Sequence, residues 1–460
     1  MSSTSLVLPE ISASERLAAA FAGMPHALPD VVGKMCDAVL TDSTGLCVAA
    51  RNTNYVRAVL SATGEPGPCT LIGHAGSFNL ATAALCNGTA AHGEDYDDTF
   101  EGGPVHAGAV IIPAILATAE QHALSGNDAT RGIAVGCEVM CRLCLVAPKR
   151  VHTAGFHPTA VFGALGAAAG VASALALDTT EWVNAIGIAG SLASGIIEYL
   201  AEGAWTKRMH PGWAAQAGYR AARMAHAGFT GPRTLFEGEH GFFHAFANMD
   251  TCDFTAMLDG VGERWLSAGI AFKPYACGTM AHPYIDCARK LVADGVRPEA
   301  VTAIECNTAE GIVHRLWEPL MAKQQPPNGY AAKFSIPYAI AVGMLRGDAG
   351  LLEYEEAVVH DPAVRSLAAK VRYVVDPNNP YPTRFTGHIR ITLKNGDVRE
   401  TAQDHFRGGR DDPLSAEAIE AKFLANCRYG GWNADRARQV RDTLRTLRAA
   451  PQVDLTLLRG

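Results

Sequence analysis

Long apolar stretches separated by short polar connections dominate the first part of the chain. Side chains three and four positions apart lie on one face of a helix, so apolar residues at this spacing predict buried or amphipathic helices. The spacing occurs at residues 14–25, 30–50, 52–60, 80–91, 109–120, 128–145, 160–177, 180–201 and 214–228. The pattern therefore predicts a large helical region whose polar connections are available for functional side chains.

The pattern changes near residue 273, where strands are expected among the helices. Strands are predicted at 301–307, 371–375 and 387–393, and helices at 332–345 and 363–369. Asn395-Gly396 is a strong signal for a hairpin that joins the third strand to residues 397–403. Helical spacing returns after Ser415. Residues 273–404 are therefore predicted to form an α+β unit.

One polar connection, the acidic loop of residues 94–99, is unusually rich in carboxylates. Four acidic side chains fall within five positions, and a glycine-rich turn then leads to His106. Polar connections between buried helices often carry catalytic groups, because the scaffold holds them in place. The alternative is a solvated loop that caps the following helix. We favour a functional loop because matching polar stretches occur downstream.

Those downstream stretches contribute histidines and lysines. Gly155–Thr159 contains His157, residues 202–213 contain Lys207 and His210, and residues 270–282 contain Lys273. Lysines and histidines together can neutralise a substrate that bears several carboxylates, and histidine supplies acid–base catalysis near neutral pH. Asp95 would orient a histidine or accept the proton itself.

Each of these residues also has a structural interpretation. We interpret His282 as a helix cap or core contact, while Lys333 could form a surface ion pair and Tyr275 could be a packing aromatic. Cys137, Cys141 and Cys144 have the spacing of a radical-SAM iron–sulfur motif. They also fall on one stripe of a helix, whereas cluster ligands need a loop, so we interpret them as core residues.

Composition limits the possible partners and the compartment. Hydrophobic residues make up 48% of the 460 positions, the net charge is −7, and no basic run is present, so nucleic acid is not an expected partner. Met1–Leu8 lacks the features of a secretory signal, and twelve cysteines then suggest reduced thiols. The uncharged run 160–177 is rich in Gly and Ala, which favours a core helix over a membrane span. We expect a cytoplasmic protein with no membrane segment.

The sequence resembles the MmgE/PrpD family over roughly residues 10–450. The family contains 2-methylcitrate dehydratase, cis-aconitate decarboxylase and iminodisuccinate epimerase. The resemblance rests on five motifs in the family's order: Asp95-Tyr96-Asp97-Asp98-Thr99 with His106, Gly155-Phe156-His157-Pro158, Thr206-Lys207 with His210 and Gly212, Lys273-Pro274-Tyr275 with His282, and Ala332-Lys333-Phe334-Ser335 with Tyr338.

The resemblance implies a mainly α fold. A helical domain of residues 1–272 would be completed by residues 405–460, beside an α+β domain of residues 273–404, and the protein would be a homodimer without metal or other cofactor. It also implies one shared pocket, with catalytic roles for Asp95, His106, His157, Lys207 and Lys273 and substrate-binding roles for Thr99, His210, Tyr275, His282 and Tyr338.

One motif departs from the family pattern. Where family members have His-Pro-Ser, this chain has His106-Ala107-Gly108, and the spacing from Thr99 to His106 is one residue longer. Both changes lie in the substrate loop, so they affect the choice of substrate more than the chemistry.

The first functional hypothesis is a cofactor-free lyase acting on a small di- or tricarboxylate, a dehydratase of the 2-methylcitrate type. Proton abstraction α to a carboxylate would precede loss of the β-hydroxyl. The same carbanion would serve an epimerase of an iminodisuccinate-like dicarboxylate, and the same pocket a cis-aconitate-type decarboxylase. A carboxylate-binding protein without activity is a fourth possibility, which the acid–base residues disfavour because binding alone needs only cations.

Overall fold

The computed structural model describes residues 9–24 and 27–460, so the expected absence of a secretory signal in Met1–Leu8 lies outside the described residues. The chain forms two compact units. The first contains the chain up to Ile270 together with Ala416–Gly460, and the second contains Ala271–Ser415. Residues 405–415 belong to the second unit, where the amide of Phe272 donates to the carbonyl of Gly408 at 2.9 Å.

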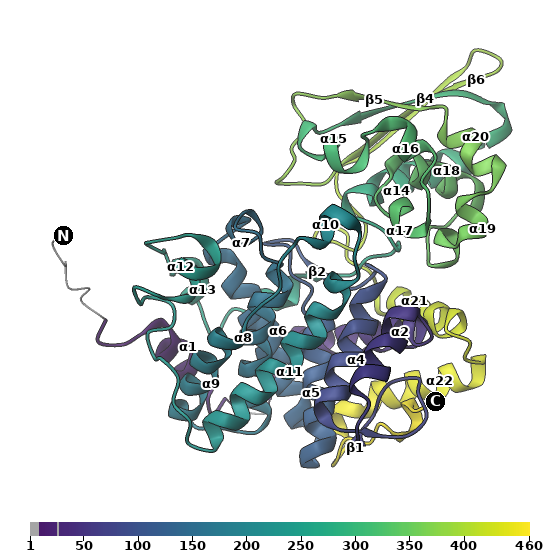
Figure 1. Ribbon diagram of the computed structural model, residues 1–460. Coiled ribbons are helices and arrows are strands. Elements are labelled where there is room, and N and C mark those ends of the chain that lie inside the picture. The colour runs from purple at the N-terminus through teal and green to yellow at the C-terminus, as the bar shows by residue number, and fades with distance from the viewer. Residues whose placement is uncertain (1–8, 25–26) are drawn as a thin grey trace. The chain divides into compact units, whose positions relative to one another are not determined.

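The first unit is almost entirely helical (Figure 1). Its elements are α1 (Ala13–Phe21), α2 (Asp30–Ala50), α3 (Asn54–Thr63), β1 (Pro66–Cys69), α4 (Leu80–Gly93), β2 (Thr99–Phe100), α5 (Gly108–His122), α6 (Gly126–Val146), α7 (Arg150–Thr153), α8 (Pro158–Ala174), α9 (Thr179–Leu192), α10 (Tyr199–Glu202), α11 (Thr206–His226), α12 (Phe242–Ala247), α13 (Thr255–Leu258), α21 (Ala416–Tyr429) and α22 (Ala434–Thr446).

Helix α8 is the centre of this unit, and all 17 of its residues are buried. Helices α5, α6, α9 and α11 pack around it. Small residues permit this, because a Cβ on Gly170 would lie 2.7 Å from the carbonyl oxygen of Gly132 on α6. The interpretation of residues 160–177 as a core helix is confirmed. None of the helices in the described part of the chain is long and apolar enough to cross a membrane.

Helices α4 and α11 approach each other closely. A Cβ on Gly212 would collide with the carbonyl of Leu85, and one on Gly88 would collide with the backbone of Gly212. This approach places the C-terminal end of α4, with His92, near the first turns of α11, with Lys207 and His210.

Two sequence expectations in this region are wrong. The helix expected at 180–201 ends at Leu192, because Ala193 is already extended, and helix resumes only as the short α10. Between them Gly195 takes a left-handed φ of 116°. The stretch 202–213, expected as a polar connection, is helical from Thr206 onward. Pro211 and Gly212 disfavour helix locally, but packing against α4 outweighs their propensity.

The second unit contains the four-stranded sheet. Strand order is β5-β4-β6-β7, with β4 parallel to β5 and antiparallel to β6. Helices α14 and α18 pack against each other, and α14 also packs against β6 and β7. Its elements, beginning with β3 at the junction of the units, are β3 (Ile270–Ala271), α14 (His282–Ala293), β4 (Val301–Thr308), α15 (Glu310–Leu316), α16 (Leu320–Gln324), α17 (Gly329–Ala332), α18 (Ile336–Arg346), α19 (Glu356–Val359), α20 (Pro362–Ala368), β5 (Val371–Val375), β6 (Gly387–Leu393) and β7 (Val398–Gln403).

The predicted hairpin between β6 and β7 is confirmed. The two strands pair from Gly387 with Gln403 to Thr392 with Val398, and Gly396 has the left-handed φ of 87° that the turn requires. The fold is therefore mainly α with a smaller α+β unit, as predicted.

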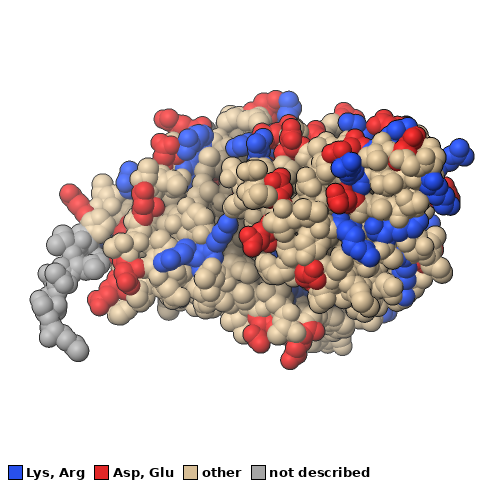
Figure 2. All heavy atoms as spheres, turned by 90° about the horizontal axis from the view of Figure 1, so that it is seen from above, with Lys and Arg blue, Asp and Glu red and all other residues tan. Residues whose placement is uncertain are grey.

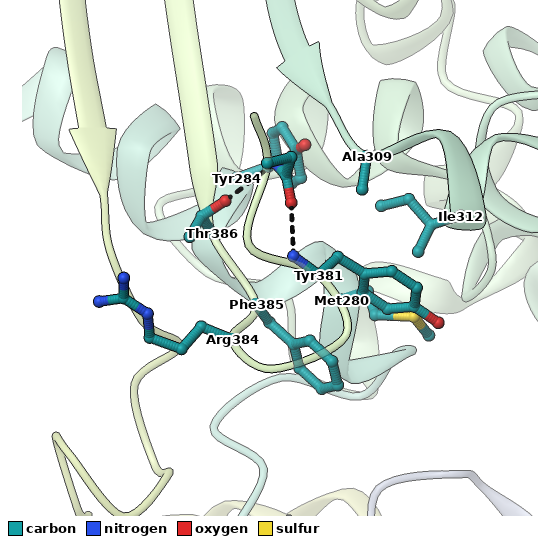
Figure 3. A pocket seen from close by; sticks show the side chains of 9 residues that line it. Met280, Tyr284, Ala309, Ile312, Tyr381, Arg384, Phe385 and Thr386 are labelled. Atoms are coloured by element: carbon teal, nitrogen blue, oxygen red, sulfur yellow. Dashed lines mark hydrogen bonds between the residues drawn. The ribbon is translucent and has the colours of Figure 1, made fainter. Parts of the chain in front are cut away.

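A small cavity lies in the second unit beside β6 (Figure 3). Tyr381 and Phe385 stack at its edge, and Asn379 donates to the hydroxyl of Thr386 at 3.1 Å. Its volume is about 10 Å³, which is room for one water molecule. This cavity is too small for an organic substrate.

Candidate active site

The acidic loop follows α4 directly and carries the first candidate pair. Asp95 has a left-handed φ of 56°, a conformation that asparagine and aspartate tolerate better than other non-glycine residues. Its carboxylate accepts a hydrogen bond from the ammonium of Lys207, in the first turn of α11, at 3.1 Å. Both side chains are largely buried, with exposed fractions of 8% and 14%. A cation is thereby held at a fixed position at the edge of the helical core.

Four histidines from four separate elements form what we call the histidine row. Ring centroids lie 5.0 Å apart for His106 and His92, 5.5 Å for His92 and His157, and 5.4 Å for His157 and His210. His92 ends α4, His106 precedes α5, His157 caps α8 and His210 lies on α11. The ring of Tyr199 stands edge-on to His157 and His210. Segments far apart in sequence therefore bring these imidazoles next to one another.

Hydrogen bonds fix the orientation of two of these rings. Nδ1 of His106 lies 2.6 Å from the backbone carbonyl of Asp98, and Nδ1 of His92 lies 2.6 Å from Oδ2 of Asp97. A carbonyl or carboxylate oxygen accepts, so each Nδ1 carries a hydrogen, and in a neutral ring the lone pair is then on Nε2. Nε2 of His92 is buried without a hydrogen-bond partner.

The other two rings share a contact of 3.2 Å between their Nδ1 atoms, so one ring donates and the other accepts. Burial, reinforced by His92 and Lys207, lowers the pKa of His157 well below its ordinary value. The same three causes lower the pKa of His210 to about 4. Both imidazoles are therefore neutral at pH 7.

The departure at His106-Ala107-Gly108 has a local physical reason. The carboxylate of Asp98 accepts the amides of Ala107 and Gly108 at 3.0 and 2.9 Å. A proline at 107 has no amide hydrogen, and a side chain at 108 would collide with Asp98 and Ser43. Burial and the neighbouring Asp97 and Asp42 raise the pKa of Asp98 to about 8, although the two amides act in the opposite direction.

Five of the predicted site residues come together in the first unit: Asp95, Lys207, His106, His157 and His210. The backbone of Thr99 forms β2, immediately after the acidic loop, and its side chain is half-buried. The chain after it turns back through Gly103, whose amide donates to the carbonyl of Phe100 at 3.2 Å. This turn delivers His106 to the histidine row.

The other predicted site residues lie in the second unit. Lys273 is buried there, and the hydroxyl of Tyr275 donates to Asp286 at 2.5 Å while accepting from Arg289 at 2.6 Å. Nε2 of His282 lies 3.2 Å from the carbonyl of Cys277. That contact agrees with the core interpretation of this histidine.

Tyr338 is also buried, and its hydroxyl donates to the carbonyl of Glu353. Lys333 is buried as well, 3% exposed, so its interpretation as a surface ion pair is wrong. Its ammonium lies 5.9 Å from the centroid of the Tyr354 ring. That Lys273, Tyr275, His282 and Tyr338 share a pocket with Asp95 stays a prediction.

Sequence reasoning missed His92 and Asp97 as individual site residues. His92 lies at the end of an alanine-rich helix, where a lone histidine is usually a core residue. The available signal was its position directly before the acidic loop, close enough for a carboxylate of that loop to reach it.

A metal could in principle be held by one group of the described residues, His92, Asp97 and His106, whose ligand atoms all lie within 4.8 Å of one another. Ligand atoms that each lie about 2.0–2.1 Å from a tetrahedral zinc are farther apart than the 2.6 Å between Nδ1 of His92 and Oδ2 of Asp97. Asp97 and Nδ1 of His92 are already joined by a hydrogen bond. The arrangement fits a carboxylate that orients an imidazole better than a metal centre.

A cavity of about 580 Å³ opens beside His210. Its wall is mostly apolar and includes Ile196, Tyr199, Met209 and Trp213. Its polar members are Ser194, Glu198, Glu202, Thr206 and His210. A cavity of this size accommodates a small organic molecule next to the histidine row.

The large helical unit and the smaller α+β unit fit the two-domain architecture of the MmgE/PrpD class. The sequence matches the MmgE/PrpD N-terminal domain over residues 15–255 and the MmgE/PrpD C-terminal domain over residues 275–446. The chain belongs to the MmgE/PrpD family.

Several relatives carry one activity in their names. The chain is 30% identical to the cis-aconitate decarboxylase of Mus musculus over 435 residues, which cover 88% of this chain and 86% of that protein. It is 31% identical to the cis-aconitate decarboxylase of Homo sapiens, over 75% of this chain and 72% of that protein. It is 26% identical to the cis-aconitate decarboxylase-like protein oryM of Aspergillus oryzae, over 78% of each chain.

Proposed function

We propose that the protein is a lyase that removes CO₂ from a small unsaturated tricarboxylate of the cis-aconitate type. The observation that carries the proposal is the histidine row beside the Asp95–Lys207 pair. The names of the relatives favour decarboxylation over the 2-methylcitrate dehydration that was our first hypothesis. Epimerisation of an iminodisuccinate-like dicarboxylate would use the same residues, but no relative described above is named for it.

The chemistry requires a cation and a proton donor. When the bond between carbon and a carboxylate breaks, CO₂ leaves and the electron pair stays on carbon, delocalised onto the remaining carboxylates. Lys207, oriented by Asp95, would stabilise the charge that develops there, which lowers the barrier more than it strengthens substrate binding. A histidine outside the neutral pair His157 and His210 first takes a proton from solvent and then gives it to carbon, so one proton is consumed for each CO₂ released.

Several accompanying features are part of the proposal. The substrate is a small polycarboxylate, the active form is a cytoplasmic homodimer, and no metal, cofactor, nucleic acid or membrane takes part. Acidic and basic side chains are interspersed over the face seen in Figure 2. On such a surface, attraction of an anionic substrate depends on local cations such as Lys207.

The test is a panel assay with purified protein and cis-aconitate, 2-methylcitrate, citrate and iminodisuccinate, followed by NMR and CO₂ detection, with and without chelator. We expect cis-aconitate to release CO₂ and to yield an unsaturated dicarboxylate that is one carbon shorter. Chelator should not lower the rate. Dehydration of 2-methylcitrate without CO₂ would restore the first hypothesis. Inversion of iminodisuccinate would identify an epimerase, and binding without turnover would contradict all three reactions.

A further inference from the structure

A lysine near the end of the chain is buried against the acidic loop. Lys422 lies on α21, which packs beside α2 although more than 350 residues separate them (Figure 1). Its ammonium lies 2.7 Å from Oδ1 of Asp42 on α2 and donates to the backbone carbonyl of Tyr96 at 2.7 Å. It also lies 3.9 Å from the centroid of the Tyr96 ring. One cation therefore holds both the backbone and the side chain of Tyr96.

The position of Tyr96 gives these contacts their importance. Tyr96 directly follows Asp95, whose left-handed φ of 56° is a conformation that persists only where surrounding contacts enforce it. Lys207 holds the Asp95 carboxylate from α11, and Lys422 holds the next peptide unit from α21. The strained residue is thus fixed on both sides by buried lysines that are distant from it in sequence.

Charge gives a second reason for a cation at this place. Asp42, Asp97 and Asp98 are all buried, with exposed fractions of 1%, 0% and 1%. Burial and repulsion by Asp97 and Asp42 raise the pKa of Asp98, and a lysine paired with Asp42 offsets part of that repulsion. Lys422, which holds the backbone of the acidic loop, therefore also reduces the electrostatic cost of burying these carboxylates together.

We propose that Lys422 is a positioning residue of the active site, which holds Asp95 through the carbonyl of Tyr96 so that the Asp95 carboxylate meets Lys207. The C-terminal helices then contribute to catalysis as well as to the core. Lys422 lies outside the five motifs that identify the family and touches no reacting group. Only the activity arm of the test below rests on the proposed function.

The experiment separates loop positioning from general stability with three variants of the full chain. Lys422→Met removes the charge and keeps the methylene stem, but it leaves Asp42 buried without this cation, which threatens folding. The double variant Asp42→Asn/Lys422→Met removes both charges. Arg142→Met is the matched control, because Arg142 pairs with Glu138 at 2.6 Å and donates to the carbonyls of Met257 and Asp259, away from the acidic loop.

Each variant is examined by thermal unfolding, by hydrogen–deuterium exchange of the peptide containing residues 94–99, and by steady-state kinetics. We expect the double variant to regain most of the thermal stability that Lys422→Met loses. Its loop amides should nevertheless exchange about tenfold faster or more than in the native protein. Its kcat should be about 10- to 100-fold lower, because small displacements of a catalytic group have effects of that size. Arg142→Met should lower the unfolding temperature and leave loop exchange unchanged.

The outcomes distinguish a role of Lys422 in positioning the acidic loop from a role in general stability. Native loop exchange in the double variant would overturn the proposal, whatever the substrate of the enzyme is. Faster loop exchange of equal size in Arg142→Met would also overturn it, since the effect would then reflect global stability. If the native protein turns over none of the panel substrates, the proposed function fails, while the exchange measurement still tests the positioning role.

Discussion

Two clusters in the helical unit contain side chains that often bind metals, and their origins differ. Cys137, Cys141 and Cys144 come from successive turns of one helix, α6. All three are buried, the thiol of Cys144 contacts the carbonyl of Cys141 at 3.0 Å, and burial raises the pKa of each thiol. They form the buried helical stripe that the sequence predicts.

The histidine row has the opposite construction. Its members come from the end of α4, the connection before α5, the N-terminus of α8 and the second turn of α11. No single helix face would bring these rings together, so tertiary packing maintains the arrangement at the cost of burying polar rings. Motif-like spacing on one helix therefore says little about chemistry, whereas convergence of polar residues from several elements is a stronger indicator.

Loss of the cation beside the histidine row should have the largest effect. Lys207→Met should lower kcat/KM by about 100- to 1,000-fold, because a preorganised charge acting on the transition state is worth about 2.7–4 kcal/mol. Steady-state kinetics with the substrate found in the panel assay measures this loss. Lys34→Met is the matched control, since Lys34 also pairs with an aspartate, at 2.7 Å, but is 74% exposed. Equal turnover in the two variants would remove Lys207 from the mechanism.

A smaller effect is expected from the carboxylate that orients His92. In Asp97→Asn the amide nitrogen can donate to Nδ1, which moves the ring hydrogen of His92 to Nε2. We expect kcat to fall about 10- to 100-fold with KM little changed. Nitrogen-15 NMR of the histidines should show the change of tautomer.

The cysteine stripe supplies the control for that variant. Cys141→Ala should lower the free energy of unfolding by about 1 kcal/mol and leave kcat within about twofold. If Cys141→Ala changed kcat as much as Asp97→Asn does, the cysteine stripe would affect catalysis as strongly as the histidine row.

The helices and the hairpin were predictable because their signals are local. Periodic apolar residues defined α2, α5 and α8, and Asn395-Gly396 defined the turn between β6 and β7. The start of α11 was missed because Pro211 and Gly212 disfavour helix locally, while their benefit, close contact with α4, depends on tertiary structure.

The residues of the candidate site also divide into those that the sequence reveals and those that only the structure reveals. His106 and His157 stand in polar stretches between apolar helices, and Lys207 lies in the polar first turn of α11. A sequence pattern reveals all three. His92 lies inside an alanine-rich helix and Lys422 lies far from the acidic loop in sequence. The role of Lys422 follows only from its contact with Tyr96, which no sequence spacing indicates. For His92 the one local signal is its position directly before the acidic loop that contains Asp97.

The histidine row should also leave a trace in the pH dependence of stability. His210 has a pKa of about 4 when folded, against an ordinary value of 6.5. Between these values the unfolded chain binds more protons than the folded one, so stability falls as pH drops from about 6.5 to 4. The slope for one such group is at most about 1.4 kcal/mol per pH unit. Asp98, with its raised pKa of about 8, opposes this trend, because its folded form holds a proton more tightly.

A difference measurement isolates the histidine from that opposing carboxylate. Denaturant unfolding of the native protein and of His210→Asn is compared at several pH values, with His240→Asn, at an exposed position, as control. Asparagine keeps a polar atom near the position of Nδ1 but does not titrate. The difference in free energy of unfolding between the native protein and His210→Asn should shrink steadily from pH 6.5 to 4. The same difference measured against His240→Asn should not shrink in this way. A constant difference for His210→Asn would mean that this imidazole keeps its ordinary protonation in the fold, and that the row is less shielded from solvent than its burial implies.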